Sequence, residues 1–219
     1  MKTRITLQEE LDRLRHDILI MASKVGEDLG KALSALKTDD RELAQEVKAN
    51  DAVINAMQLK IEDDTSILIA TQAPVATDLR ELVTIFKITG NLERIGDHAV
   101  HLAKAALKLS GEPPFRSIEH IDRMAETGQQ MLRAAIAAFL AKDTDAARKT
   151  AAMDSIIDAE HKLLTEETLK LMKERPRFVK KAVRLLNASG YLERLGDHIT
   201  NICEGIIYMV EAKHEELND

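Results

Sequence analysis

The chain has 219 residues, of which 45% are hydrophobic, 31% charged and 3% aromatic, with only four prolines and nine glycines. This composition is typical of long amphipathic helices and argues against a β-sandwich or a disordered chain. The formal net charge of −6 argues against nucleic acid as a partner, because binding nucleic acid usually requires a basic surface.

Apolar residues spaced three and four apart run through nearly the whole chain and predict an all-α fold. Breaks fall at capping residues such as Asp40 and Asp143, and before Pro74 and Pro176, where helical geometry is disfavoured. The expected helices are 7–37, 40–71, 76–109, 116–141, 143–174 and 177–213. The strongest break is the Ser-Gly-Glu-Pro-Pro segment at 110–114. We therefore expect a first three-helix bundle over 1–110, a joint at 111–114 and a second bundle over 115–219.

A nine-residue segment occurs twice and supports this division. Residues 90–98, Gly-Asn-Leu-Glu-Arg-Ile-Gly-Asp-His, return at 190–198 with seven of nine positions identical. Such a repeat indicates a duplicated unit. Each half should then be an up-down-up bundle of helices about 45 Å long.

The repeated segment carries carboxylates four residues apart, which lie on one face of a helix. On a helical wheel, Glu93 and Asp97 lie nearly opposite the apolar stripe of their helix, so we expect them to face outward. Glu193 and Asp197 repeat the arrangement. The preceding helix of each half adds a polar row beside its own apolar stripe, with Asp51, Asn55, Gln58 and Glu62 in the first half and Asp154, Asp158 and His161 in the second.

If these helices are neighbours, four to six side-chain oxygens converge in each half. Like charges repel at this spacing, and a bound cation would reverse that effect. All-oxygen ligands suit Mg²⁺, Ca²⁺ or Mn²⁺, and also iron with added water. His98 and His198 lie about 100° around the helix from the second carboxylate, so we expect flanking positions for them. The alternative is a solvated acidic face neutralised by Arg94 and Arg194. The second site, with one more carboxylate, should bind metal more tightly.

These residues resemble the PhoU family of bacterial phosphate-specific transport accessory proteins. The resemblance rests on Leu-Glu-Arg-Ile-Gly-Asp at 92–97 and its copy at 192–197, together with Pro74-Val-Ala-Thr-Asp-Leu-Arg80 and Asn-Ile-Cys-Glu at 201–204. It implies two three-helix bundles with surface clusters of iron or zinc on Glu/Asp-x-x-x-Asp motifs. By position these motifs are Glu93/Asp97, Glu193/Asp197 and Asp154/Asp158, with Asp51/Asn55 as an imperfect fourth. The chain departs from the family pattern at Gln58 and at 178–180.

The resemblance also implies a function. A family member would damp the phosphate-starvation response by linking the ATPase subunit of the phosphate transporter to a membrane sensor histidine kinase. We expect a cytoplasmic protein that reaches the membrane only through its partners, because the chain begins without an apolar signal segment and has no apolar run of about 18 residues. We also expect a homodimer, because six rod-like helices in two layers leave broad sides with alanine and leucine. We expect no enzymatic activity.

Two alternative functions follow from the carboxylates. A metal-dependent phosphatase or hydrolase could use them to activate water, but an outward-facing groove lacks the pocket that such chemistry needs. A ferritin-like di-iron bundle requires inward Glu-x-x-His motifs, and the only such spacing is Glu211 to His214, in the tail.

Two further features have both a structural and a functional interpretation. Basic residues near the last turn, including Lys180, Lys181 and Arg184, either balance helix ends or dock an anionic membrane or partner. The single cysteine, Cys203, lies among apolar helical positions, where we expect a buried, inert thiol in a reducing compartment.

Overall fold

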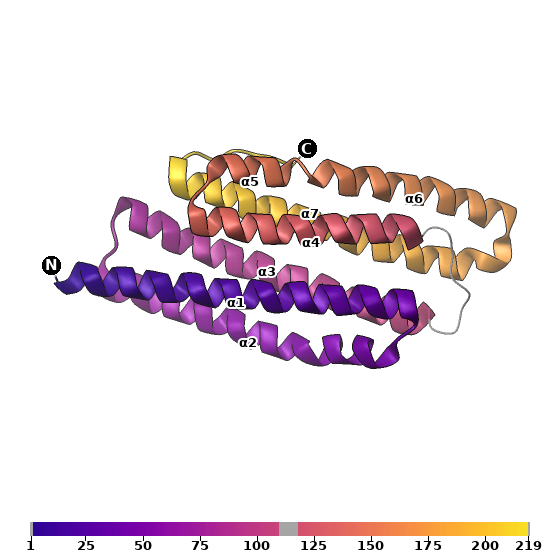
Figure 1. Cartoon of the computed structure of the whole chain (residues 1–219), viewed down its shortest axis with the longest axis horizontal. Coiled ribbons are helices and arrows are strands. Elements are labelled where there is room, and N and C mark those ends of the chain that lie inside the picture. Colours follow the sequence, from indigo (N-terminus) through magenta and orange to yellow (C-terminus); the bar gives the residue numbers. More distant parts are fainter. Residues whose placement is uncertain (1, 110–117, 219) are drawn as a thin grey trace.

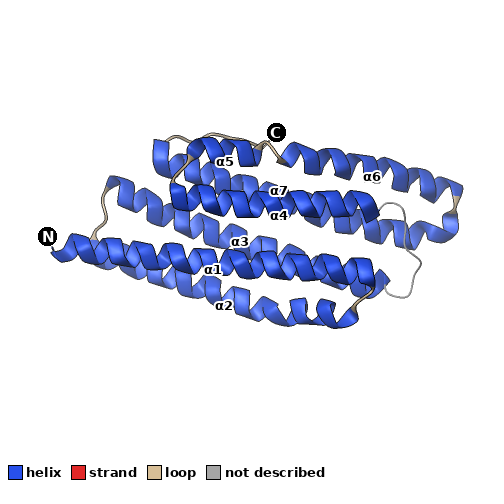
Figure 2. Cartoon of the chain, in the orientation of Figure 1, coloured by secondary structure: helices blue, strands red, loops and turns tan. Residues whose placement is uncertain are grey.

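The computed structural model describes residues 2–109 and 118–218, and in this part of the chain it contains helices and turns but no β-strand (Figures 1 and 2). The helices are α1 (Lys2–Thr38), α2 (Arg41–Gln72), α3 (Ala76–Leu109), α4 (Ile118–Ala141), α5 (Thr144–Ala151), α6 (Asp154–Glu174), the 3₁₀ helix η1 (Pro176–Phe178) and α7 (Val179–Glu211). The all-α prediction is therefore confirmed. The predicted joint at 111–114 lies outside the described residues.

The helices form two sets that lie along a common long axis (Figure 1). Helices α1, α2 and α3 pack on one another, and α7 packs against α4, α5 and α6. Helix α3 also packs along α7, and α1 packs along α4, so the two sets make one elongated body. The apolar stripe predicted for the third helix is confirmed, since its members Ile85, Ile88, Leu92, Ile95, Ala99 and Ala106 are all buried.

The predicted single helix over 143–174 is wrong, because it is broken into α5 and α6. At the break the backbone N–H of Met153 donates to the carbonyl of Thr150 (3.1 Å), and that of Ile156 donates to the carbonyl of Met153 (3.0 Å). These are the tighter i to i+3 bonds of a 3₁₀ turn. The hydroxyl of Thr150 also donates to the carbonyl of Ala146 (2.8 Å), a bond that bends helices.

The break has a consequence for the acidic residue that follows it. Asp154 is the first residue of α6 and is only 8% exposed. Asp51, at the matching position of the uninterrupted helix α2, is half-buried. The two halves therefore differ in shape where their predicted ligands lie.

Helices α3 and α7 run antiparallel and join the halves along a seam. The Thr84 hydroxyl donates to the carbonyl of Gly205 (3.2 Å), Nε of Arg80 donates to that of Met209 (3.3 Å), and Nη1 of Arg184 donates to that of Lys108 (2.5 Å). This register places the repeated segments, 90–98 and 190–198, beside each other near the middle of the body. The duplicated motif is thus also the contact between the duplicates.

Candidate functional site

The first acidic cluster consists of Asp51, Asn55, Glu93 and Asp97, on α2 and α3. The side chain of Glu93 is only 17% exposed and that of Asp97 is 31% exposed. The prediction that they face outward overstated their exposure, because both side chains lie half-buried where α3 meets α2. Burial and then the nearby Asp97 raise the pKa of Glu93, and Asp51 and Glu62 on α2 add to this effect. Carboxylates of the two helices thus converge.

Part of this charge is balanced within the cluster. Arg94 places Nη1 3.2 Å from Oδ2 of Asp97 and Nε 3.6 Å from Oε2 of Glu93. On α2, the Gln58 amide donates to Glu62 (3.1 Å). Arg94 is 61% exposed, so these are solvated ion pairs that contribute little to stability. In the first half the arrangement therefore matches the alternative interpretation, a solvated acidic face neutralised by Arg94.

The second acidic cluster consists of Asp154, Asp158, Glu193 and Asp197, on α6 and α7. Burial, followed by Asp158, Asp197 and Glu193, raises the pKa of Asp154 to about 7. Burial and Asp158 also raise the pKa of Asp197. All four carboxylates therefore lie close enough to affect the protonation of one another. The sequence predicted this convergence on the condition that the two helices are neighbours, and α6 and α7 do pack on each other.

Asp154 occupies a special position in this cluster. Its Oδ1 is buried and has no hydrogen-bond partner, and the nearby Thr200 hydroxyl lowers the pKa of the carboxyl only against the stronger effect of burial. It also lies so close to α7 that a Cβ added to Gly196 would be 2.0 Å away. The glycine of the repeated motif thus makes room for the carboxylate. A buried acceptor without a donor is costly unless it is protonated or meets a cation, so the donor chemistry of this cluster fits a hard metal ion.

The metal itself remains a prediction. Across residues 2–109 and 118–218, no three His, Cys, Asp or Glu side chains are placed as ligands of one ion. The carboxylates in each cluster converge without adopting coordination geometry. A cation would have to draw them together.

The histidines of the motif lie in the seam between α3 and α7. The rings of His98 and His198 stack with centroids 5.5 Å apart, and His98 also stacks on Tyr191 (6.0 Å). Nδ1 of His198 lies 3.0 Å from Oδ1 of Asn91. Sequence reasoning missed this seam, although a signal was present. Asn91 and Tyr191 are where the copies differ most, and each contacts the histidine of the other copy.

Other predicted residues fall in separate places. His161 places Nδ1 3.0 Å from the Ser189 hydroxyl and lies near Glu193, whose pKa it lowers against the stronger effect of burial. Arg194 is exposed. Cys203 is buried as expected, and burial raises the pKa of its thiol to about 12.

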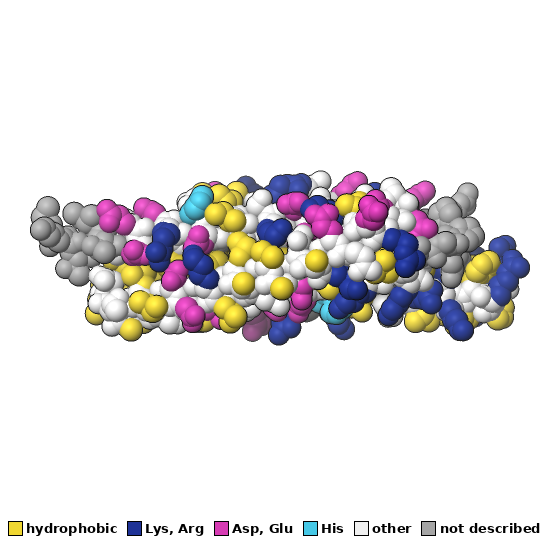
Figure 3. Space-filling view, turned by 90° about the horizontal axis from the view of Figure 1, so that it is seen from below, with side chains coloured by type: hydrophobic (Ala, Val, Ile, Leu, Met, Phe, Trp, Pro, Cys, Tyr) yellow, Lys and Arg dark blue, Asp and Glu magenta, His cyan; other side chains and the backbone are white. Residues whose placement is uncertain are grey.

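The predicted basic docking residues do not form one exposed patch. Lys181 is 6% exposed, Arg184 donates to the Lys108 carbonyl, and Lys180 is exposed. Lys and Arg side chains nonetheless gather toward the end of the body where α6 turns into α7 (Figure 3).

Comparison with known proteins identifies the family. The family model described as PhoU domain matches twice, at residues 18–106 and 121–206. The chain belongs to the PhoU family. The two matched segments run from α1 into α3 and from α4 into α7, so each PhoU domain carries one acidic cluster. None of the described helices has the length and hydropathy needed to cross a bilayer.

Individual PhoU relatives match over nearly the full chain. A phosphate-specific transport system accessory protein PhoU homolog of Clostridium acetobutylicum is 34% identical over 99% of this chain and 100% of its own length. A Pseudomonas aeruginosa homolog with the same description is 36% identical over 93% of this chain and 84% of its own.

Two solved structures of PhoU proteins have the same fold. The crystal structure of PhoU from Pseudomonas aeruginosa has a TM-score of 0.90 at 35% identity, covering 94% of this chain and 99% of that one. That of the phosphate transport system regulatory protein PhoU from Streptococcus pneumoniae has a TM-score of 0.90 at 31% identity, covering 96% and 99%.

Proposed function

We propose that this chain is a cytoplasmic regulator of phosphate uptake that damps the phosphate-starvation response when phosphate is plentiful. It would act as an adaptor between the ATPase subunit of the phosphate transporter and a sensor histidine kinase. The observation that carries the proposal is the full-length match to relatives described as accessory proteins of the phosphate-specific transport system. An adaptor works by binding two states of its partner with different affinity, so it needs no catalytic group.

The shape of the molecule supports an adaptor. The body is a long set of packed helices whose outer faces are charged, with single exposed apolar side chains such as Ile156 and Leu163 on α6 and Ile67 on α2. Such faces can serve several protein contacts at once. We include a homodimer in the proposal, and sedimentation velocity across a range of concentrations tests it.

The acidic clusters would bind cations, with the second cluster binding more tightly. Support comes from the mutual effect of its four carboxylates and from the unpartnered Oδ1 of Asp154. Iron and zinc are the metals that the family implies, with Mg²⁺, Mn²⁺ and Ca²⁺ suited to the donors. Elemental analysis of protein purified without chelators or nickel resin tests this part. Metal that is retained by the Asp197→Asn variant in wild-type amounts would contradict it.

The regulatory role is tested in the native bacterium. Deleting the gene should leave transcription of the phosphate transporter high in phosphate-rich medium, and a plasmid copy of the wild-type gene should restore repression. Normal repression in the deletion strain would refute the proposal. A pull-down with the purified ATPase subunit and the kinase then tests the adaptor role. Phosphatase turnover in a metal screen, lost in Asp197→Ala, would point to the hydrolase instead.

A further inference from the structure

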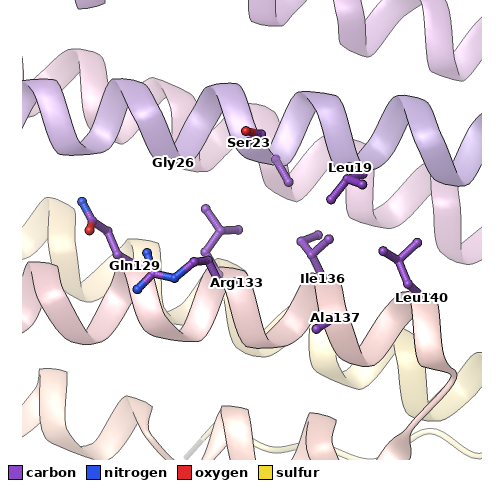
Figure 4. A pocket seen from close by; sticks show the side chains of 10 residues that line it. Leu19, Ser23, Gly26, Gln129, Arg133, Ile136, Ala137 and Leu140 are labelled. Atoms are coloured by element: carbon purple, nitrogen blue, oxygen red, sulfur yellow. The ribbon is translucent and has the colours of Figure 1, made fainter.

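A groove runs between α1 and α4 on a surface that carries none of the acidic clusters. One of its cavities has a volume of about 390 Å³ and lies between Leu19 and Gly26 of α1 and Gln129, Arg133, Ile136 and Leu140 of α4 (Figure 4). We call this surface the α1–α4 groove. It exists only because the two halves pack together, since α1 belongs to one repeat and α4 to the other.

The groove is long and open rather than a closed pocket. A second cavity of about 330 Å³ continues it past Gln129 toward Lys37 and Asp122. Together the cavities follow α1 from Leu19 to Lys37, a length of about 27 Å. The groove is lined in part by small residues, Ala22 and Gly26 on α1 and Ala137 on α4, whose short side chains leave space between the two helices. A small molecule would leave most of this length empty, whereas one helix of about five turns fits it.

The two ends of the groove differ although the duplication should make them alike. Asp40 and Asp143 are both N-caps, so Lys37 and Leu140, each three residues before its cap, occupy matching positions. Asp122 and Leu19 also occupy matching positions, because each lies 21 residues before the N-cap of its own repeat. At one end Lys37 pairs with Asp122 at 2.9 Å, whereas at the other Leu19 and Leu140 are apolar and remain 42% and 39% exposed. One end is thus closed by an ion pair and the other offers apolar contact.

Arg133 sets the charge of the apolar section. It is the only charged side chain that lines the larger cavity, it is exposed, and it makes no hydrogen bond or ion pair with any residue of the described part of the chain. A ligand that covered the apolar side chains without supplying a carboxylate would desolvate this guanidinium at a cost. Arginine and a carboxylate form a charge-assisted pair.

We propose that the α1–α4 groove binds an amphipathic helix of a partner protein. The apolar face of that helix would carry side chains at i, i+4 and i+7 that fill the space beside Leu19, Ile136 and Leu140, with an Asp or Glu beside them that pairs with Arg133. The proposal goes beyond the proposed function, which assigns partners but no surface, and it can fail while that function stands.

The test uses two designed peptides of about 18 residues with the same apolar stripe. One has Glu and the other Lys at the position facing Arg133, and both carry fluorescein. Fluorescence anisotropy should show the Glu peptide binding with a Kd of about 10 µM and the Lys peptide binding about tenfold more weakly. Arg133→Glu should reverse this order, because the charges are then exchanged.

Blocking variants separate the groove from other surfaces. Ala137→Trp and Leu19→Lys should each weaken binding of the Glu peptide at least tenfold, about 1.4 kcal/mol. Both sites are exposed, so folding should persist, and circular dichroism checks this. Ala70→Trp is the matched control, an exposed helical alanine on α2, and should bind normally.

Four results would overturn the proposal. The first is the absence of saturable binding of the Glu peptide to the wild-type protein. The second is equal binding of both peptides, and the third is binding of the Glu peptide that survives Ala137→Trp. The fourth is self-association that Ala137→Trp abolishes, which would make a second copy of this chain the occupant of the groove.

Discussion

Glu81 and Lys142 join the two halves of the molecule through an ion pair in which the Glu81 carboxylate is buried and the Lys142 side chain is 41% exposed. Lys142 lies in the turn between α4 and α5, and its Nζ donates to Oε2 of Glu81 on α3 at 2.6 Å. Glu81 is only 2% exposed, and its Oε1 accepts a second bond from Nε of Arg15 on α1, also at 2.6 Å. One buried carboxylate therefore connects α1, α3 and the second repeat.

Removing Arg15 should destabilise the protein strongly. In Arg15→Met, Glu81 would stay buried with only the more exposed Lys142 to balance it, and the free energy of unfolding should fall by about 3 kcal/mol. Urea unfolding followed by circular dichroism measures this. Arg13→Met is the control, because Arg13 forms solvated pairs with Glu10 and Asp64, and its loss should change stability by about 0.5 kcal/mol or less. Equal losses in both variants would show that the buried triad adds nothing.

Two glycines of the second repeated motif should respond in opposite directions to alanine. A Cβ at Gly190 meets nothing within 4 Å, so Gly190→Ala should stabilise α7 by about 0.5–1 kcal/mol. A Cβ at Gly196 would come 2.0 Å from Oδ1 of Asp154, so Gly196→Ala should destabilise by about 2 kcal/mol.

A double mutant then identifies the cause. In Asp154→Ala with Gly196→Ala the clashing oxygen is gone, so the double variant should be more stable, by about 1–2 kcal/mol, than the sum of the two single changes in the free energy of unfolding predicts. Additive changes would mean that Asp154 does not pack on Gly196. Urea unfolding in EDTA gives all the values.

The sequence predicted the helices well and placed the carboxylates of each helix on one face, because both follow from the 3.6-residue period. Their convergence also required α2 to pack on α3 and α6 to pack on α7, which we stated as a condition. The sequence did not predict the break at 152–153, where neither Gly nor Pro interrupts the pattern and the Thr150 side chain competes for the backbone. It also overstated the exposure of Glu93. A helical wheel gives the angle between a residue and the apolar stripe of its own helix. It does not show how far a neighbouring helix buries residues on the opposite face. Nor can periodicity show that α3 meets α7, since this depends on the packing of two units.

The second acidic cluster should make stability depend on pH when no metal is present. The pKa of Asp154 is about 7 in the folded protein against 3.8 for a free side chain. The folded state therefore binds its proton more tightly, and the free energy of unfolding falls as pH rises from about 4 to about 7 and is level above that. Asp154→Asn removes this loss and should be more stable than wild type by about 2 kcal/mol at pH 8 in EDTA, with little difference at pH 4.

The control for this measurement is Asp63→Asn, at an exposed carboxylate on α2. It should follow the wild-type curve within about 0.5 kcal/mol at every pH. If Asp154→Asn is less stable than wild type at pH 8, the carboxylate is held by a donor in the folded protein and the view of an unsatisfied Oδ1 is wrong.

His98 should make the free energy of unfolding fall as the pH is lowered, which is opposite to the effect of Asp154. Both of its ring nitrogens are buried without a hydrogen-bond partner, and burial, followed by His198 and His101, lowers its pKa from 6.5 to about 4. As pH falls below 6.5 the unfolded chain takes up this proton first, so stability is lost until about pH 4. His98→Phe keeps a ring against Tyr191 but cannot be protonated. Between pH 7 and pH 5 the wild type should therefore lose about 2 kcal/mol more than the variant, whereas His16→Gln, at an exposed site on α1, should lose as much as wild type. If the free energies of unfolding of wild type and His98→Phe, measured in urea, change equally with pH, then His98 is protonated as easily in the folded protein as in the unfolded chain, which would contradict the prediction.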